Sequence, residues 1–176
     1  AQNKPFAIDK KIAIVAHQKA SSLQNAIFNN AYGIPAGKLG SEILEESLEH
    51  LTNSYPHIQQ IHGEKVLSIS GEAGNFTIST NKSSLQAKIV VIAIGAGNPF
   101  NIEGLESFVM PHQKAAPEKN RIQLKNNDHL VTEGIYAAGV LAGHRSQLSI
   151  AAGSGASVAT DILTFWNNGN PVQVHD

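Results

Sequence analysis

Ile89-Val90-Val91-Ile92-Ala93-Ile94-Gly95-Ala96-Gly97 is the stretch of sequence that decides the fold. Its first six residues are apolar without alternation, which is typical of a central strand buried on both faces of a parallel sheet. The two glycines end the strand in a turn. Because such a strand is covered by helices, the stretch predicts an α/β layered domain.

On the amino-terminal side of this strand, two further elements are expected. Residues 11–16 form a short apolar run that is typical of another buried parallel strand. A helix should begin at Gly40-Ser41, because Glu42 and two further glutamates follow and acidic side chains are stabilised near a helix amino terminus. It should end at Tyr55-Pro56, since the residue before a proline avoids the α-helical region.

The remaining elements complete the expected fold. Strand-like stretches at 65–70, 75–80 and 85–94, separated by turns, predict a small antiparallel meander. An irregular stretch at 98–119 precedes two short strands, around 121–124 and 134–138, and a final helix from about Leu148 to Trp166. We therefore expect residues 1–176 to form one three-layer α/β domain with a parallel sheet, the meander, and helices on the faces.

Composition narrows the chemistry that this chain can perform. It contains no cysteine, which excludes disulfides, thiolate metal sites and thiol–disulfide exchange by this chain alone. The net charge is −1 and there is no basic run, so nucleic-acid binding is not expected. The longest apolar run, residues 89–96, is strand-sized, so no membrane contact is expected, and the expected location is cytoplasmic.

Three segments resemble the FAD-binding domain of thioredoxin reductase and related pyridine nucleotide-disulfide oxidoreductases. Residues 89–99, followed by Ile102-Glu103-Gly104-Leu105, are similar to the family's apolar strand ending in Ala-Thr-Gly-Ala. Gly134-Ile135-Tyr136-Ala137-Ala138-Gly139 is similar to the strand that lies beside the flavin. Residues 147–156, Gln-Leu-Ser-Ile-Ala-Ala-Gly-Ser-Gly-Ala, resemble the segment that opens the family's last helix. The resemblance implies an FAD/NAD(P)-binding-like fold.

The resemblance also implies a cofactor site. Gln147 and the backbone near Leu148 would bind the polar edge of the flavin ring, and Gly139 would let the chain pass close to the cofactor. Small residues at a helix start allow backbone amides to approach a planar or anionic ligand, but they also permit close helix–sheet packing without any ligand. The cofactor-binding residues that we expect are Gly95, Ala96, Gly139, Val140, Gln147, Leu148 and Gly153, with FAD as the cofactor.

Several polar contacts of the family are missing from this sequence. No glycine lies in residues 1–10, so the Gly-x-Gly-x-x-Gly loop that seats the FAD pyrophosphate is absent. The acidic residue that binds a ribose hydroxyl falls at Ala16 or His17, where no carboxylate is present. Val140 stands where the family has aspartate, and Ile94 stands where it has threonine. These losses weaken the expected polar contacts with FAD.

The family's NAD(P)H-binding domain is also missing. In the family it separates the Ala-Thr-Gly and Ala-Ala-Gly-Asp segments, whereas here only residues 98–134 join them. The expected organisation is a first FAD-domain part at 11–97, a short connection at 98–120 and a carboxyl-terminal part at 121–169. Because the family's redox cysteines belong to the missing domain, this chain should not reduce disulfides on its own.

Candidate catalytic residues are few. His144-Arg145 precedes the segment expected at the flavin edge, so this pair is the candidate for acid–base or anion-binding work, although such a pair is more often part of a solvated loop. The eight histidines show none of the local spacings typical of metal ligands, so no metal site is expected.

The leading hypothesis is an FAD-linked, oxidoreductase-like domain with a small-molecule or protein redox partner. Two alternatives stay open: a non-catalytic binding module that has lost the cofactor, and a fragment completed by a second copy, another chain or another segment. In a working site Gln147 and Gly139 should line a cavity, whereas in a module without cofactor Val140 and Ile94 should fill that space. A fragment should leave an exposed, unpaired strand edge beside residues 11–16.

Overall fold

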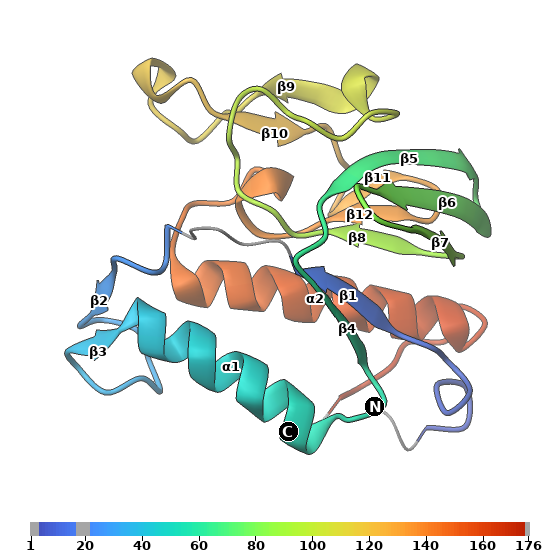
Figure 1. Cartoon of the computed structure of the whole chain (residues 1–176), viewed down its shortest axis with the longest axis horizontal. Helices are drawn as coiled ribbons and strands as arrows, with labels where there is room; N and C mark the ends of the chain where they lie inside the picture. Colours follow the sequence, from blue (N-terminus) through green and yellow to red (C-terminus); the bar gives the residue numbers. More distant parts are fainter. Residues whose placement is uncertain (1–3, 17–21, 175–176) are drawn as a thin grey trace. The chain divides into compact units, whose positions relative to one another are not determined.

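The computed structural model describes residues 4–16 and 22–174, so His17 lies outside the described residues. The chain divides into two compact units. Unit 1 comprises Ala1–Ile8 and Val66–Asp176, and unit 2 comprises Asp9–Lys65. Figure 1 traces the elements of both units in chain order.

Unit 2 is built around one helix, α1 (Gly40–Ser54), which confirms the helix expected from the sequence. The Glu42 carboxylate accepts a hydrogen bond from the Leu39 N–H at 3.2 Å, and this satisfies an amide at the helix start. A Cβ at Gly40 would fall onto the carbonyl oxygen of Leu23, so only glycine fits where the helix begins. The strands of unit 2 are β1 (Ala13–Ala16), β2 (Ile27–Phe28), β3 (Lys38–Leu39) and β4 (Gln59–His62).

Strand β1 is less buried than its sequence suggests. It pairs in parallel with β4, Ala13 lying opposite Gln59, and no other described strand pairs with it. Ile12 is 39% exposed and Ile14 is 40% exposed. The strand expected at 11–16 is thus confirmed from Ala13 onward, but its expected burial is wrong, because no described strand covers its second edge.

Unit 1 contains the antiparallel meander that the sequence predicts. Its strands are β5 (Val66–Glu72), β6 (Asn75–Thr80) and β7 (Ser84–Ala87), in the order β5–β6–β7. Phe76 and Ile78, which alternate with polar residues along β6, are 3% and 7% exposed. The alternation therefore places one face of β6 in the core, as expected for a half-buried strand.

A second sheet of unit 1 has the order β11–β12–β8 and consists of β8 (Val90–Ile92), β11 (Leu130–Thr132) and β12 (Ile135–Ala137). β12 is parallel to β8 and antiparallel to β11. The prediction that residues 89–94 form a central strand buried on both faces is wrong. β8 is short and lies at the edge of the described sheet, and this leaves Val91 43% exposed and Ile94 44% exposed.

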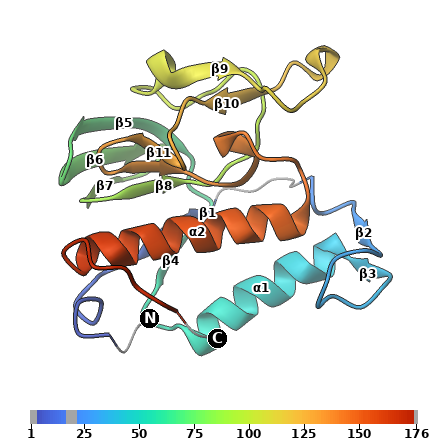
Figure 2. The same ribbon diagram turned by 180° about the vertical axis from the view of Figure 1, so that it is seen from behind.

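The other elements of unit 1 close its core. β9 (Val109–Pro111) pairs with β10 (Ile122–Leu124), and the short helices η1 (Glu106–Phe108) and η2 (Pro117–Lys119) flank them. In Figures 1 and 2 this hairpin and α2 (Leu148–Trp166) lie on opposite sides of the β11–β12–β8 sheet. The core cluster of buried hydrophobic residues comprises Ile69, Phe76, Ile78, Ile92, Ile102, Leu105, Ile122, Leu124, Ile135, Ala137, Leu141 and Ala142.

Helix α2 has the bounds expected from the sequence. It is long and apolar enough to cross a membrane by length and composition, a test that a helix in a folded domain also passes. Ser154, Val158 and Leu163 of this helix are buried in the fold. The absence of a membrane partner stays a prediction.

The two units together show a mixed α/β fold with small sheets and few helices in the described residues. The expected α/β class and the meander are confirmed, whereas a single parallel sheet is replaced by two short parallel pairs, β1–β4 and β8–β12. The three-layer arrangement and the division into parts at 11–97, 98–120 and 121–169 stay predictions.

Candidate functional site

Four of the expected site residues, Gly95, Ala96, Gly139 and Val140, follow the carboxyl ends of β8 and β12. These strands are parallel, with Ile92 opposite Ala137, and the Ala138 N–H donates to the Ile92 carbonyl at 3.0 Å. Residues 93–97 and the short helix η3 (Gly139–Ala142) therefore leave the sheet at the same edge. In open α/β sheets this edge is where ligands usually bind.

Gly139 is held against α2 and does not line open space. Its backbone is in the left-handed region at φ +66°, and its N–H donates to Ser154 Oγ at 2.8 Å. A Cβ added here would lie 3.7 Å from the Ala151 Cβ. The freedom of this glycine thus serves the close packing of η3 on the helix, which is the structural alternative to a cofactor contact.

The other expected cofactor-binding residues differ in accessibility. A Cβ at Gly95 or Gly153 would meet nothing within 4 Å, so both glycines border open space. Gln147 is the N-cap residue of α2, is exposed, and makes no capping hydrogen bond with its side chain. Ala96 is buried, and its carbonyl accepts a hydrogen bond from the Ile122 N–H at 3.2 Å. Val140 and Leu148 are half-buried.

Behind this edge lies a hydrogen-bonded network centred on His129. The side chain of His129 is 6% exposed, and its Nε2 lies 2.9 Å from Ser154 Oγ and 3.0 Å from His144 Nε2. Because the two imidazole Nε2 atoms are within hydrogen-bond distance, only one proton can lie between them. The network therefore joins the interior of unit 1 to His144, one of the two catalytic candidates.

The surroundings of His144 disfavour its protonated form. Burial lowers the pKa of His144 below its usual 6.5, with further lowering from His129 and Lys114, while Asp128 acts in the opposite direction. Buried His129 Nδ1 has no hydrogen-bond partner among the described residues, and Asp128 Oδ1 lies 3.5 Å from it.

The backbone that presents His129 is strained. Asp128 and His129 have φ values of +45° and +73°, a region that non-glycine residues seldom adopt. Asn126 stabilises this turn, because its Oδ1 accepts from the His129 N–H at 3.0 Å while its Nδ2 donates to the Ala142 carbonyl at 3.1 Å. Such strained residues are often found at functional sites.

His144 opens onto a pocket of about 430 Å³ that we call the cationic pocket. Two segments of unit 1 form it, residues 112–121 and 140–147. Four of its lining residues carry a permanent positive charge, and no described lining residue is acidic. The lining residues are His112, Lys114, Ala115, Ala116, Lys119, Arg121, Val140, His144, Arg145, Ser146 and Gln147.

His112 fixes the two walls of the cationic pocket relative to each other. It is 8% exposed, and its Nδ1 accepts a hydrogen bond from the Lys114 N–H at 3.1 Å. This contact assigns the proton of the neutral ring to Nε2, which donates to the Val140 carbonyl at 3.1 Å. One buried side chain therefore links both segments.

Similar proteins were found only at the level of structure. No family model and no curated protein matches the chain. The ferredoxin-flavin thioredoxin reductase from Clostridium acetobutylicum is similar with a TM-score of 0.67 and 17% identity, over 93% of this chain and 91% of that chain. A thioredoxin reductase from Gloeobacter violaceus is similar with a TM-score of 0.66 and 12% identity, over 92% of this chain and 89% of that chain. The thioredoxin reductase from T. acidophilum is similar with a TM-score of 0.53 and 15% identity, over 83% of this chain and 86% of that chain. The chain has the fold of thioredoxin-reductase-like flavoproteins.

Within this thioredoxin-reductase-like fold, the cationic pocket contains four residues that the sequence analysis selected: Val140, His144, Arg145 and Gln147. Gly95, Ala96, Gly139, Leu148 and Gly153 lie outside it. Ile94, expected to fill the site of a module without cofactor, is instead largely exposed.

Sequence reasoning missed Lys114, Lys119 and Arg121. Three cations within eight residues, in a stretch with one acid, were the available signal. The sequence pattern of that stretch predicts only an irregular connection.

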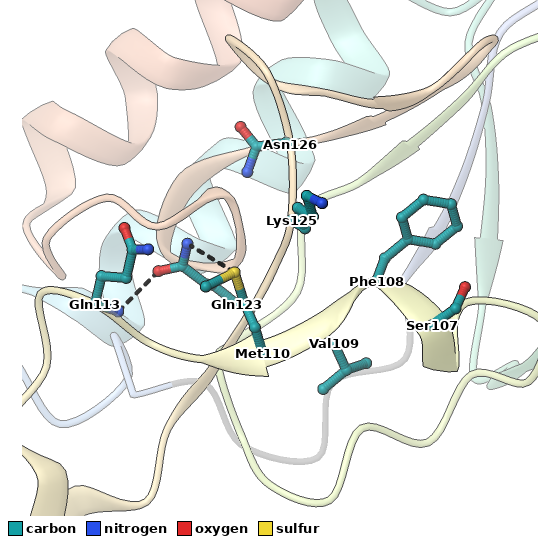
Figure 3. A pocket seen from close by; sticks show the side chains of 8 residues that line it. All are labelled: Ser107, Phe108, Val109, Met110, Gln113, Gln123, Lys125 and Asn126. Atoms are coloured by element: carbon teal, nitrogen blue, oxygen red, sulfur yellow. Dashed lines mark hydrogen bonds between the residues drawn. The ribbon is translucent and has the colours of Figure 1, made fainter.

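A second hollow, of about 440 Å³, lies beside β9 and β10 in unit 1. Figure 3 shows Gln123 between Gln113 and Met110 on its wall. The Gln123 Oε1 accepts from the Gln113 N–H at 2.9 Å, and its Nε2 faces Met110 Sδ at 3.9 Å. Because this buried amide is satisfied internally, it is not free to bind a ligand, and the hollow contains none of the expected site residues.

Proposed function

We propose that this chain is a flavin-binding, oxidoreductase-like domain of the thioredoxin-reductase type that does not reduce disulfides by itself. The observation that carries the proposal is its likeness in fold to thioredoxin reductases over 93% of the chain. The absence of cysteine supports the second half of the proposal, because a dithiol relay needs thiols that this chain lacks.

The residues at the carboxyl edge of β8 and β12 fit a planar ligand. Gly95 and Gly153 border open space, so a ring system could approach the backbone there. The exposed Gln147 carboxamide has both donors and an acceptor for the polar edge of such a ring. FAD would supply the electron-transfer chemistry when bound, and the chain would bind and orient it.

The histidine pair and Arg145 would assist at this edge. His144 and His129 hold one proton between their Nε2 atoms, which are 3.0 Å apart, so the pair can give up or accept a proton where His144 meets the pocket. Arg145 is exposed at the pocket wall and would bind an anionic group of the ligand or substrate.

The visible absorption spectrum of the purified chain and an FAD titration followed by flavin fluorescence test this proposal. We expect saturable binding that Gln147→Ala weakens and that Gln24→Ala, at an exposed site of unit 2, leaves unchanged. Gly153→Leu is the sharper variant. It should block the ring while raising helix stability, because glycine is a poor helix former.

One outcome would contradict flavin binding, and a second would contradict its placement at the β8–β12 edge. A colourless protein that shows no saturable FAD binding would overturn it directly. Unchanged binding by Gly153→Leu, in a variant whose unfolding temperature has not fallen, would place the flavin away from this edge.

A second candidate is a domain completed by one more strand, supplied by another segment or chain. The observation that favours it is β1, which pairs only with β4 among the described strands and leaves Ile14 40% exposed. Hydrogen exchange of the β1 amides at two protein concentrations tests this candidate. If the amides on both edges of β1 exchange slowly, and more slowly at the higher protein concentration, a second copy supplies the strand. Fast exchange on one edge at both concentrations would exclude a strand supplied by a second copy.

A further inference from the structure

The cationic pocket concentrates charge in a chain that is otherwise balanced. The chain has 13 Lys and Arg residues and 14 Asp and Glu residues. Lys114, Lys119, Arg121 and Arg145 line one pocket of unit 1, and no acidic residue lines it in the described part of the chain. None of these four forms an ion pair with a described carboxylate, so their charges are available to a ligand.

The pocket is preformed. Its volume of about 430 Å³ is within the range of small-molecule sites. The buried His112 bridges its two walls through the Lys114 N–H and the Val140 carbonyl. A ligand would therefore meet cations whose supporting backbone is already positioned, and less ordering entropy would be lost on binding.

The chemistry of the lining selects the ligand. Two of the cations are arginines, whose planar guanidinium groups bind phosphate oxygens through paired hydrogen bonds, and two are lysines, which act as point charges. The number of cations and the volume exceed what one small monoanion needs. The charge of Lys114 also acts on His144, because burial, then His129 and then Lys114 lower the pKa of His144.

We propose that the cationic pocket binds a diphosphate group carried by a small molecule. Two sources share this chemistry: the diphosphate of a flavin nucleotide bound at the adjoining edge, and a separate diphosphate ligand. Val140 and Gln147 belong both to the pocket and to the expected flavin site, so the first source would anchor the cofactor at this site. Binding of the diphosphate group itself does not depend on the proposed flavin function.

Isothermal titration of the whole chain with inorganic pyrophosphate tests the pocket, with inorganic phosphate as the comparison. We expect saturable 1:1 binding that is at least about tenfold tighter for pyrophosphate. Each charge-assisted contact removed should weaken binding about tenfold, so Lys114→Gln/Arg145→Gln should lose about a hundredfold. The matched control Lys82→Gln/Lys88→Gln, at exposed lysines of unit 1, should stay within about twofold.

Two results would overturn the inference that the cationic pocket binds diphosphate. One is no saturable pyrophosphate binding by the folded chain, and the other is equal weakening of pyrophosphate binding in the pocket and control variants. A circular-dichroism spectrum and an unfolding temperature for each variant establish that it is folded. All four substituted side chains are exposed, so loss of the fold is not expected.

Competition distinguishes the two sources and separates this inference from the flavin proposal. If pyrophosphate displaces FAD, and the pocket variant weakens FAD but not riboflavin, the diphosphate is that of the cofactor. If pyrophosphate binds beside FAD, or binds when FAD does not, the diphosphate ligand is separate from the flavin and the pocket inference is supported. If FAD binds and pyrophosphate does not, the pocket inference fails while the flavin proposal survives.

Discussion

Ser154 joins three parts of unit 1 through a single hydroxyl group. Its Oγ accepts from the Gly139 N–H at 2.8 Å and lies 2.9 Å from His129 Nε2, and the residue is only 6% exposed. Ser154→Ala would leave the buried Gly139 N–H without this acceptor, and His129 Nε2 would keep only His144 Nε2 as a partner. We expect a loss of about 1–3 kcal/mol in the free energy of unfolding, measured by urea denaturation.

Ser157→Ala is the matched control for this prediction. It makes the same substitution three residues along α2, at an exposed position. The control should change stability by less than about 0.5 kcal/mol. Equal effects of the two variants would mean that the hydroxyl of Ser154 does not hold the network together.

His144 gives stability a dependence on pH. Its pKa is lowered from 6.5 in the fold, by burial first and then by His129 and Lys114, with Asp128 opposing. The unfolded chain therefore binds a proton here at a pH where the folded chain does not. Stability from this residue is complete above about pH 6.5 and is lost as the pH falls toward the folded pKa.

His144→Gln should flatten this dependence. Unfolding temperatures measured between about pH 7.5 and 5.5 should fall more for the unmodified chain than for His144→Gln. Gln24→Ala, at an exposed position of unit 2 whose side chain does not titrate, should leave the slope unchanged. Parallel slopes for all three proteins would contradict the prediction.

The sequence predicted which residues lie near the site better than it predicted the hydrogen bonds that hold them in place. His144, Arg145, Val140 and Gln147 were selected, and the fold brings them to one pocket. Partners such as His112 and Ser154 were missed, because each acquires its role from residues 15 or more positions away. Such pairings follow from tertiary structure and leave no local pattern.

In unit 1, the segment Ile102–Leu105 lies against β5 and forms an isolated parallel bridge between Glu103 and Ser68. The Ile69 N–H donates to the Glu103 carbonyl at 2.9 Å, and the Glu103 N–H donates to the Leu67 carbonyl at 2.8 Å. Gly104 follows at φ +95°, and a Cβ there would fall onto the Ile69 carbonyl oxygen. The close approach of these two backbones therefore requires glycine.

Gly104→Ala should separate this segment from β5. We expect a loss of more than about 2 kcal/mol in unfolding free energy, from the left-handed backbone and the displaced carbonyl together. Gly74→Ala is the control, because its φ is +85° but a Cβ there meets nothing within 4 Å. It should lose only the conformational part, about 1–2 kcal/mol by thermal or urea unfolding, and equal losses would argue against the steric clash.

The elements that could be predicted are those whose local signals agree. α1 has its acidic first turn and terminal proline, β6 alternates cleanly, and α2 ends at a turn of two asparagines and a glycine. β8 and β1 were predicted as strands but not as exposed ones. An apolar run shows that a strand forms, whereas the number of neighbours on its edges depends on the rest of the sheet.

At the scale of the whole molecule, burial is uneven between the two units. All fully buried hydrophobic side chains among the described residues belong to unit 1, whereas Gly40 is the one residue of unit 2 described as buried. Hydrophobic burial is the main favourable term in folding, so unit 2 should be the less stable unit. A flavin bound at the β8–β12 edge would raise the free energy of unfolding of unit 1 and need not change that of unit 2.

Hydrogen exchange read by mass spectrometry should therefore separate the two units. Gly40→Ala, which pushes a Cβ onto the Leu23 carbonyl, should speed exchange in peptides from residues 22–62 and leave those from 66–174 unchanged. Gly104→Ala should have the opposite effect, since its clash with Ile69 lies within unit 1. If either variant sped exchange equally in both sets of peptides, the chain would open as one cooperative unit, and that result would support the expectation of a single domain for residues 1–176.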